Sequence, residues 1–347
     1  MSISVRQVLI AHATWHGDAA QVQAMDVALN SKLANTRALL ASWRPLGSSH
    51  HSGDSDWASP SERFWAQAAG WLPETSPATD NDNSERSQPL PLAALELGDQ
   101  LPPNLPAAWL SPVHVLASMN DVRLSHPNHL QLSEAHSNTL LEALKPLCAE
   151  DGVDLSYVAP HRWLLAGERL RGIVSPSMTL ACDQPINDYL PFSTSHPASA
   201  QWLRRLQNEA QMLFYTHPVH DERLALGLQP VTGIWLHGAG AIAEHRDHSH
   251  ISRNNELAQH AHQPFDWQAA WAALDAGTMA ALLGQGHTQA FEVCFASHNG
   301  ITRYASPALS AAQGANKTTL LQRLSHTITH GWRQQAPTLL PSALAPQ

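Results

Sequence analysis

Residue types that bind metal ions recur at short spacing in one polar stretch of the sequence, HRDHSHISRNNELAQHAH. This stretch contains His245, Asp247, His248 and His250, and imidazole and carboxylate groups at such spacing suit zinc or manganese. It offers no helical face that would hold these side chains together, and further histidines follow at His260 and His262. A solvated loop rich in histidine is therefore the interpretation that we favour over a metal site.

Glycines after a predicted strand are a second feature that could do chemistry. Val231–Leu236 is typical of a buried strand, and it runs into His237-Gly238-Ala239-Gly240. Glycines just past a strand let backbone amides approach an anionic ligand. The run Gly238–Ala243 also fits a loose dinucleotide fingerprint, but no clear helix follows to bind a pyrophosphate. We therefore expect a glycine turn near an anionic ligand rather than a dinucleotide site.

An amphipathic helix and a second, short helix are predicted before this strand. His217-Pro218 should end the amphipathic helix, because proline lacks an amide donor and restricts the residue before it. Asp221–Leu226 is then typical of a short helix closed by Gly227. The apolar positions that recur at helical spacing are Leu203, Leu206, Ala210, Leu213 and Phe214.

Strands and helices alternate along the rest of the chain, which favours an α/β fold or an α+β lobe carried on an α/β core. We expect a loop over Pro45–Pro60, where serine, histidine, glycine and aspartate are frequent. The predicted strands are Val5–Ala11, Val153–Val158, Arg162–Ala166 and Phe291–Phe295, and the predicted helices are Ala20–Trp43, a segment from about Ser133 to Pro146, Asp266–Leu283 and Lys317–Trp332.

Composition limits the classes of protein and partner. Apolar residues make up 43% of the 347 positions, which is enough for a sizeable core. A charged fraction of 14% and a formal net charge of -9 argue against nucleic acid and against an anionic membrane surface as partners. Three scattered cysteines, Cys148, Cys182 and Cys294, suggest reduced thiols. With neither a signal peptide nor a membrane-spanning stretch predicted, we expect a cytoplasmic protein.

The stretch Leu206–Gly240 resembles a known pattern, NE…L…HPVN…R…G…PAN…RGAG, of the archaeal-type cofactor-independent phosphoglycerate mutases. It is still more similar to the RpfE-type regulatory proteins. Mutases carry asparagine where this sequence has His220 and Thr232, and arginine where it has His237. Loss of a permanently charged group at a phosphate-handling position argues against mutase activity. The positions that fit the pattern are Asn208, Glu209, His217, Pro218, Val219, Arg223, Gly227, Pro230, Gly238 and Gly240.

The resemblance implies an α/β fold in which an alkaline-phosphatase-like core carries an inserted α+β lobe. It implies a discontinuous core over residues 1–108 and 200–335 and a substrate lobe over residues 109–199. Residues 336–347 would form a loose tail.

The resemblance also implies where a catalytic centre would lie. SPSERFWAQAAGWLP resembles the mutases' nucleophile segment, PGSD…LLGYDP, with Ser61 on the nucleophilic serine, where a helix start would stabilise a phosphoryl group. Alternatively, Ser59 or Ser61 only caps the helix, with Pro60 or Glu62 in its first turn. In the superfamily the first strand ends in an aspartate that ligates a metal, and here only Asp18 is available, several residues late.

PHRWLLAGERL resembles the mutases' HR segment, on a strand of the lobe that closes over the substrate. Arg162 is thus the first candidate ligand for a phosphate or a carboxylate, because a guanidinium binds either in bidentate fashion, and Arg223 is the second. The pattern also implies substrate-binding positions at His217, Asn208 and His237. The ligand would be a small phosphorylated or carboxylated metabolite.

We therefore expect a phosphoglycerate-mutase-like protein that has lost catalysis and keeps a binding or regulatory role. One alternative is an active metal-dependent mutase or phosphomonoesterase, in which Ser61 acts beside two manganese or zinc ions. The ligands for such ions would come from Asp18, His245, Asp247 and His248. Another alternative is a protein-interaction scaffold that binds a protein partner.

Overall fold

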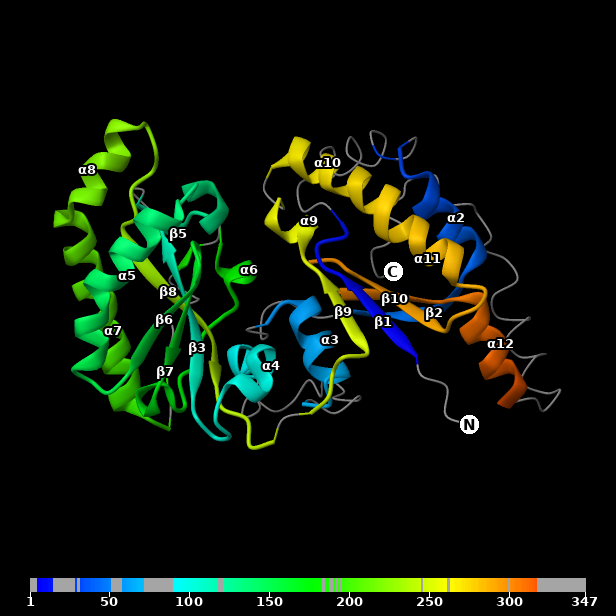
Figure 1. Ribbon diagram of the computed structural model, residues 1–347, viewed down its shortest axis with the longest axis horizontal. Helices are drawn as coiled ribbons and strands as arrows, with labels where there is room; N and C mark the ends of the chain where they lie inside the picture. Colours follow the sequence, from blue (N-terminus) through cyan, green and yellow to red (C-terminus); the bar gives the residue numbers. More distant parts are fainter. Residues whose placement is uncertain are drawn as a thin grey trace. The chain divides into compact units, whose positions relative to one another are not determined.

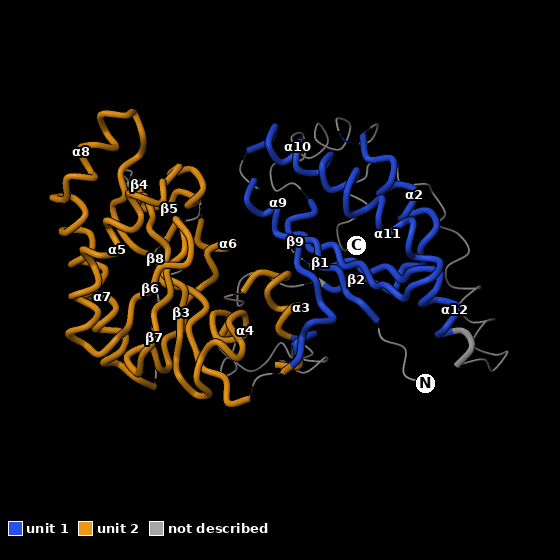
Figure 2. Tube along the Cα trace, viewed as in Figure 1, with its two compact units in different colours: residues 1–54, 67–69, 247–347 blue, residues 55–66, 70–246 orange. Residues whose placement is uncertain are grey.

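The computed structural model describes residues 5–14, 29, 32–50, 58–71, 90–117, 121–182, 185–186, 190, 193, 195–244, 246–260, 263–298 and 300–316. The chain divides into two compact units (Figure 2). Unit 1 comprises residues 1–54, 67–69 and 247–347, and unit 2 comprises residues 55–66 and 70–246. The boundaries expected for a core and an inserted lobe stay a prediction.

Unit 1 is built on a mixed sheet in the order β2-β11-β10-β1-β9. Strand β1 (Arg6–Ile10) runs parallel to β10 (Phe291–Ala296) and β9 (Ile251–Asn254). Strand β11 (Gly300–Ala305) is antiparallel to β10 and to the edge strand β2 (Arg44–His50). The mixed sheet with its helices confirms the α/β class.

Helices of unit 1 cover one face of this sheet (Figure 1). They are α2 (Ala34–Ser42), α10 (Pro264–Leu274) and α11 (Ala280–Gln285), the last two joined by a π-helical turn, Asp275–Met279. Trp267 and Trp271 pack with Phe295 in the core between them. The short helix α9 (Glu256–Gln259) and helix α12 (Pro307–Asn316) complete the described part of the unit.

Unit 2 contains an antiparallel sheet in the order β6-β7-β3-β8. Helices α5 (Glu134–Ala149) and α7 (Pro197–Thr216) lie on one side of it and α4 (Leu92–Leu97) on the other (Figure 1). On α7, the predicted apolar positions Leu203, Leu206, Ala210 and Phe214 are buried against the sheet. The strands are β3 (Ala107–Val113), β6 (Asp154–Ala159), β7 (Arg162–Ala166) and β8 (Gly233–Gly240).

The remaining elements of unit 2 are short. Strands β4 (Val115–Ala117) and β5 (Val122–Leu124) form a hairpin, and α8 (Pro218–Ala225) follows α7 directly. The other helices are α3 (Pro60–Ala68, whose last residues belong to unit 1), α6 (Met178–Ala181), and the 3-10 turns η1 (Gly98–Gln100), η2 (Pro127–Leu130) and η3 (Glu168–Leu170).

Two expectations about elements were wrong. The first part of the loop expected over Pro45–Pro60 is strand β2, which pairs with β11 at the edge of the sheet. Its polar residues lack the apolar pattern by which a strand is recognised in a sequence. The proline Pro146 does not end α5, which continues to Ala149. The predicted helix Lys317–Trp332 and the tail over residues 336–347 lie outside the described residues.

No helix in the described part of the chain combines the length and the apolar character that a membrane crossing requires.

Candidate functional site

Three neighbouring strands of unit 2 present one polar group of side chains on the sheet face that α4 covers. Alternate residues of a strand point to opposite faces, so Trp109 on β3, Arg162 on β7 and His237 on β8 lie opposite the apolar core under α5 and α7. Ser111, two residues after Trp109, lies on the same face. We call Glu96, Trp109, Ser111, Arg162, Trp235 and His237 the Arg162 cluster.

Arg162 is held by an aromatic ring and a carboxylate. Its guanidinium carbon lies 3.7 Å from the centre of a Trp109 ring, a cation–π contact. One terminal nitrogen pairs with the Oε2 atom of Glu96 on α4. The side chains of Arg162 and Glu96 are 38% and 21% exposed, so solvent reaches this end of the cluster. Arg162 is therefore fixed in position and accessible.

His237 is an uncharged member of the cluster. It lies directly across from Trp109 in the β3–β8 register, and its Nε2 atom lies 3.2 Å from the Ser111 hydroxyl. Burial, with a further contribution from the charge of Arg162, lowers the pKa of His237 to about 3. The imidazole is thus neutral near pH 7 and acts as a hydrogen-bonding group, whereas an arginine at this position would add a fixed charge.

Two tryptophans on the same sheet face have buried indole donors without a described partner. Trp235 on β8 pairs with Ser111, so it is a diagonal neighbour of Trp109 on the same face. The two tryptophans are 2% and 3% exposed, respectively. Neither indole nitrogen has a hydrogen-bond partner among the residues that the structure describes. A tryptophan N–H can only donate, so both are suited to an oxygen acceptor.

The glycines of β8 have a packing role that the sequence did not indicate. They lie inside the strand, and the turn expected after Leu236 is wrong. A Cβ atom on Gly238 would lie 2.9 Å from Cβ of Leu92, and one on Gly240 would lie 2.7 Å from Cβ of Pro91. The glycines therefore let α4 approach the sheet closely enough for Glu96 to reach Arg162.

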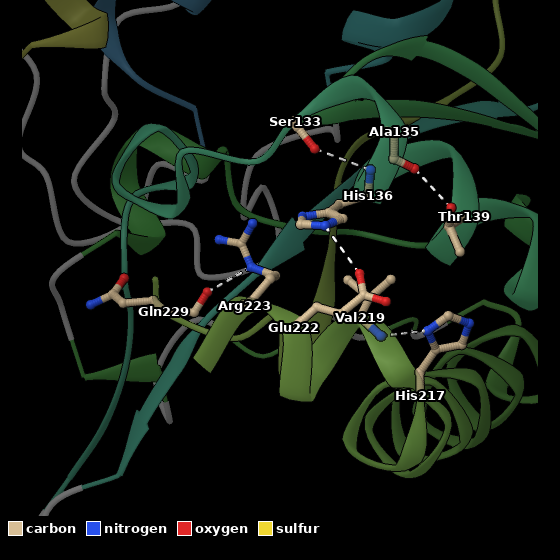
Figure 3. Close-up of polar contacts among 9 residues, drawn as sticks. All are labelled: Ser133, Ala135, His136, Thr139, His217, Val219, Glu222, Arg223 and Gln229. Carbon is tan, nitrogen blue, oxygen red and sulfur yellow. Dashed lines mark hydrogen bonds and ion pairs between the residues drawn. The ribbon is translucent and has the colours of Figure 1, made fainter. Parts of the chain in front are cut away.

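Arg223 is committed to the backbone of unit 2. It is fully buried on α8, and its Nε atom donates to the carbonyl oxygen of Gln229 at 2.9 Å (Figure 3). One terminal nitrogen donates to the carbonyl oxygen of Leu130, and the other has no partner among the described residues. Burial lowers the pKa of Arg223, and burial together with Arg223 lowers the pKa of His161. Arg223 thus ties α8 to two neighbouring segments.

The other two candidate substrate ligands lie on α7 and at the start of α8. His217 caps α8, because its Nδ1 atom accepts a hydrogen bond from the amide of Val219 at 3.2 Å (Figure 3). Asn208 is exposed on α7. Of the predicted ligands, the structure brings Arg162 and His237 together in one cluster, and for Asn208, His217 and Arg223 a role in binding stays a prediction.

Ser61 lies in the first turn of α3, beside a capping box. The backbone amide of Ser59 donates to Oε2 of Glu62 at 2.7 Å, and the amide of Glu62 donates to Oγ of Ser59 at 3.3 Å. Ser61 is buried, and its hydroxyl lies 3.0 Å from that of Ser59. Ser59 is therefore the capping residue, and a nucleophilic role for Ser61 stays a prediction.

The described candidates for metal ligands do not make up a two-metal centre. Asp18 and His245 lie outside the described residues. Asp247 is exposed and accepts a hydrogen bond from the amide of Ser249 at 2.8 Å, which lowers its pKa, and His248 is half-buried. Within the described ranges, no group of three or more histidine, cysteine, aspartate or glutamate side chains could hold a metal ion.

Comparison with known proteins gives distant structural matches only. No family model matches the chain, and no curated protein matches its sequence significantly. A cofactor-independent phosphoglycerate mutase from Thermoplasma acidophilum DSM 1728 shares 14% identity over 87% of this chain and 90% of its own, with a TM-score of 0.35. The PH0037 protein from Pyrococcus horikoshii shares 9% identity over 88% of each chain, with a TM-score of 0.45. Likeness at this level assigns neither a family nor any residue's role.

Proposed function

We propose that this protein binds a small phosphorylated or carboxylated metabolite at the Arg162 cluster and has a binding or regulatory role without catalysis. The observation that carries the proposal is the geometry around Arg162. A cation–π contact at 3.7 Å and an ion pair with Glu96 hold a guanidinium that is still 38% exposed. Such a group is pre-organised to bind a planar or tetrahedral anion in bidentate fashion.

The neighbours of Arg162 support binding rather than group transfer. His237 is neutral, and the Ser111 hydroxyl beside it lies 3.2 Å from its ring nitrogen. These groups can orient an oxygen-rich ligand through hydrogen bonds. They place little positive charge where a phosphoryl group in transfer would need it. A resemblance to phosphoglycerate mutases with a histidine in the arginine position agrees with retained binding and lost turnover.

Isothermal titration calorimetry with 3-phosphoglycerate and with D-glycerate tests the proposal. We expect the wild-type chain to bind at least one of the two compounds, and Arg162→Gln to weaken that binding by about tenfold or more, since it removes a charge-assisted contact. The matched control is Arg171→Gln, because Arg171 forms an exposed ion pair with Glu168 elsewhere in unit 2. Binding of neither compound by the wild-type chain would refute the proposal.

The competing function is an active mutase or phosphomonoesterase that uses Ser61. It is tested by incubating the full chain with 3-phosphoglycerate in manganese or zinc and following the products by phosphorus NMR. We expect no turnover in the wild-type chain or in Ser61→Ala. Turnover that disappears in Ser61→Ala would replace the proposed binding role with catalysis.

A further inference from the structure

The Arg162 cluster carries almost no net charge, and this limits what it can bind. The positive charge of Arg162 is matched by the negative charge of Glu96, with which it pairs directly. His237, the other basic side chain of the cluster, contributes no charge near pH 7. A phosphomonoester carries about -1.5 to -2 charges at pH 7, so the cluster cannot neutralise it. A dianion would therefore lose its hydration without gaining enough electrostatic attraction from the cluster to offset that cost.

The hydrogen-bonding groups of the cluster nevertheless suit a ligand rich in oxygen. The indole N–H groups of Trp109 and Trp235 are buried donors without a partner in the described part of the chain. Ser111 is 3% exposed, and its hydroxyl lies 3.2 Å from the Nε2 atom of His237. Hydroxyl and carboxyl oxygens accept hydrogen bonds from such neutral donors without needing further positive charge.

Glu96 shows which anion the guanidinium accepts. It is a carboxylate carried on α4, and it occupies one side of Arg162 while the Trp109 ring occupies a face. An incoming carboxylate can take the place of Glu96 with the same charge and the same planar geometry. Glu96 is partly exposed, so its side chain can turn into solvent. The exchange then keeps the cluster close to neutral, because one carboxylate replaces another.

We infer that the Arg162 cluster binds an unphosphorylated hydroxy acid, with its carboxylate on Arg162 in place of Glu96 and its hydroxyl oxygens on Trp109, Trp235 and Ser111. The inference rests on the proposed binding function and decides between its two classes of ligand. Glu96 acts as an internal competitor that keeps weakly bound anions out of the cluster.

The test compares D-glycerate, 3-phosphoglycerate and inorganic phosphate by calorimetry on the full-length wild-type chain. We expect D-glycerate to bind about tenfold or more tightly than 3-phosphoglycerate, and phosphate to give no heat of binding. Tighter binding of 3-phosphoglycerate, or binding of phosphate, would overturn the inference and leave the proposed function standing. Binding of none of the three would refute the proposed function itself.

A variant tests the role of Glu96 separately. Glu96→Gln removes the competing carboxylate and its negative charge from the Arg162 cluster, so D-glycerate should bind about tenfold more tightly and 3-phosphoglycerate should gain measurable affinity. Glu168→Gln is the matched control, because Glu168 pairs with Arg171 on the surface of the same unit. Unchanged affinities in a folded Glu96→Gln chain would contradict the role of Glu96, and the wild-type comparison does not depend on this variant.

Discussion

At the scale of single residues, His237 is the group whose chemistry the fold changes most clearly. Its folded-state pKa is about 3, below the ordinary value of 6.5. Below pH 6.5 the unfolded chain therefore takes up a proton that the folded chain refuses. The stability that neutral His237 contributes is present above that pH and is lost as the pH falls toward 3, by at most about 1.4 kcal/mol per pH unit.

Urea unfolding at a series of pH values measures this effect. Between pH 6.5 and about pH 4, His237→Gln should gain stability relative to the wild-type chain, because glutamine takes up no proton in either state. His287→Gln, a change at an exposed histidine, is the control. A difference between wild type and His237→Gln that stays constant with pH would show that the imidazole is not held neutral.

Arg223 allows a structural role to be separated from a binding role. Arg223→Lys keeps the charge but cannot reach both carbonyl oxygens, so it should lower the free energy of unfolding by about 1–3 kcal/mol. Binding of D-glycerate by the folded fraction should not change. Unchanged stability together with lost binding would show that Arg223 binds D-glycerate directly and has no structural role.

The residue scale also shows where sequence reasoning stops. Arg162 and His237 were recognisable through the resemblance, and they lie in one cluster. Glu96, Trp109 and Trp235 were missed, because their meeting depends on strand register and on the docking of α4. The only available signal was the two-residue spacing of polar and aromatic side chains along β3, which does not identify the neighbouring strands.

At the scale of elements, a distant carboxylate caps helix α2. Asp275, in the π-helical turn, accepts hydrogen bonds from the amide and the hydroxyl of Thr36, both at 2.6 Å, and from the amide of Asn35 at 3.2 Å. Asp275→Ala should therefore lower the free energy of unfolding by about 1–2 kcal/mol. Urea unfolding checks this against Asp266→Ala, at an exposed position in the first turn of α10. An equal effect of both changes would mean that the cap contributes nothing of its own.

The start of α3 makes a second prediction about an element. Ser59→Ala removes the capping hydroxyl and should lower the free energy of unfolding by about 1 kcal/mol. Ser61→Ala should change it less, because within the described part of the chain the hydroxyl of Ser61 is hydrogen-bonded only to that of Ser59. Thermal or urea unfolding of the two variants measures both changes. A larger loss of stability for Ser61→Ala would show that Ser61, and not Ser59, is the capping residue.

Elements with a regular apolar face were predictable, and elements defined by their neighbours were not. Helix α7 follows from its helical spacing of apolar residues, four of which are buried. Strand β2 has no such pattern, because it is a polar edge strand stabilised by pairing with β11. The glycines of β8 were misinterpreted since the reason for them, the approach of Leu92 and Pro91, lies far away in the sequence.

At the scale of the whole molecule, each unit has its own sheet and its own apolar core, and the Arg162 cluster lies entirely within unit 2. The chain carries a formal net charge of -9 and therefore repels anions in general. A ligand with one negative charge is repelled less strongly than a dianion, which agrees with a hydroxy acid as the ligand. The composition of the sequence indicated that a highly anionic partner is unfavourable. The position of the Arg162 cluster became known only from the fold.

The most direct test of this account observes the buried indole groups themselves. The chain has twelve tryptophans, so a nitrogen–proton correlation NMR spectrum contains a manageable set of indole signals, which Trp109→Phe and Trp235→Phe would assign. On titration with D-glycerate, we predict that the Trp109 and Trp235 signals shift together, in the direction of a new hydrogen bond, and that Arg162→Gln abolishes both shifts. Binding of D-glycerate that leaves these two signals in place would contradict the account.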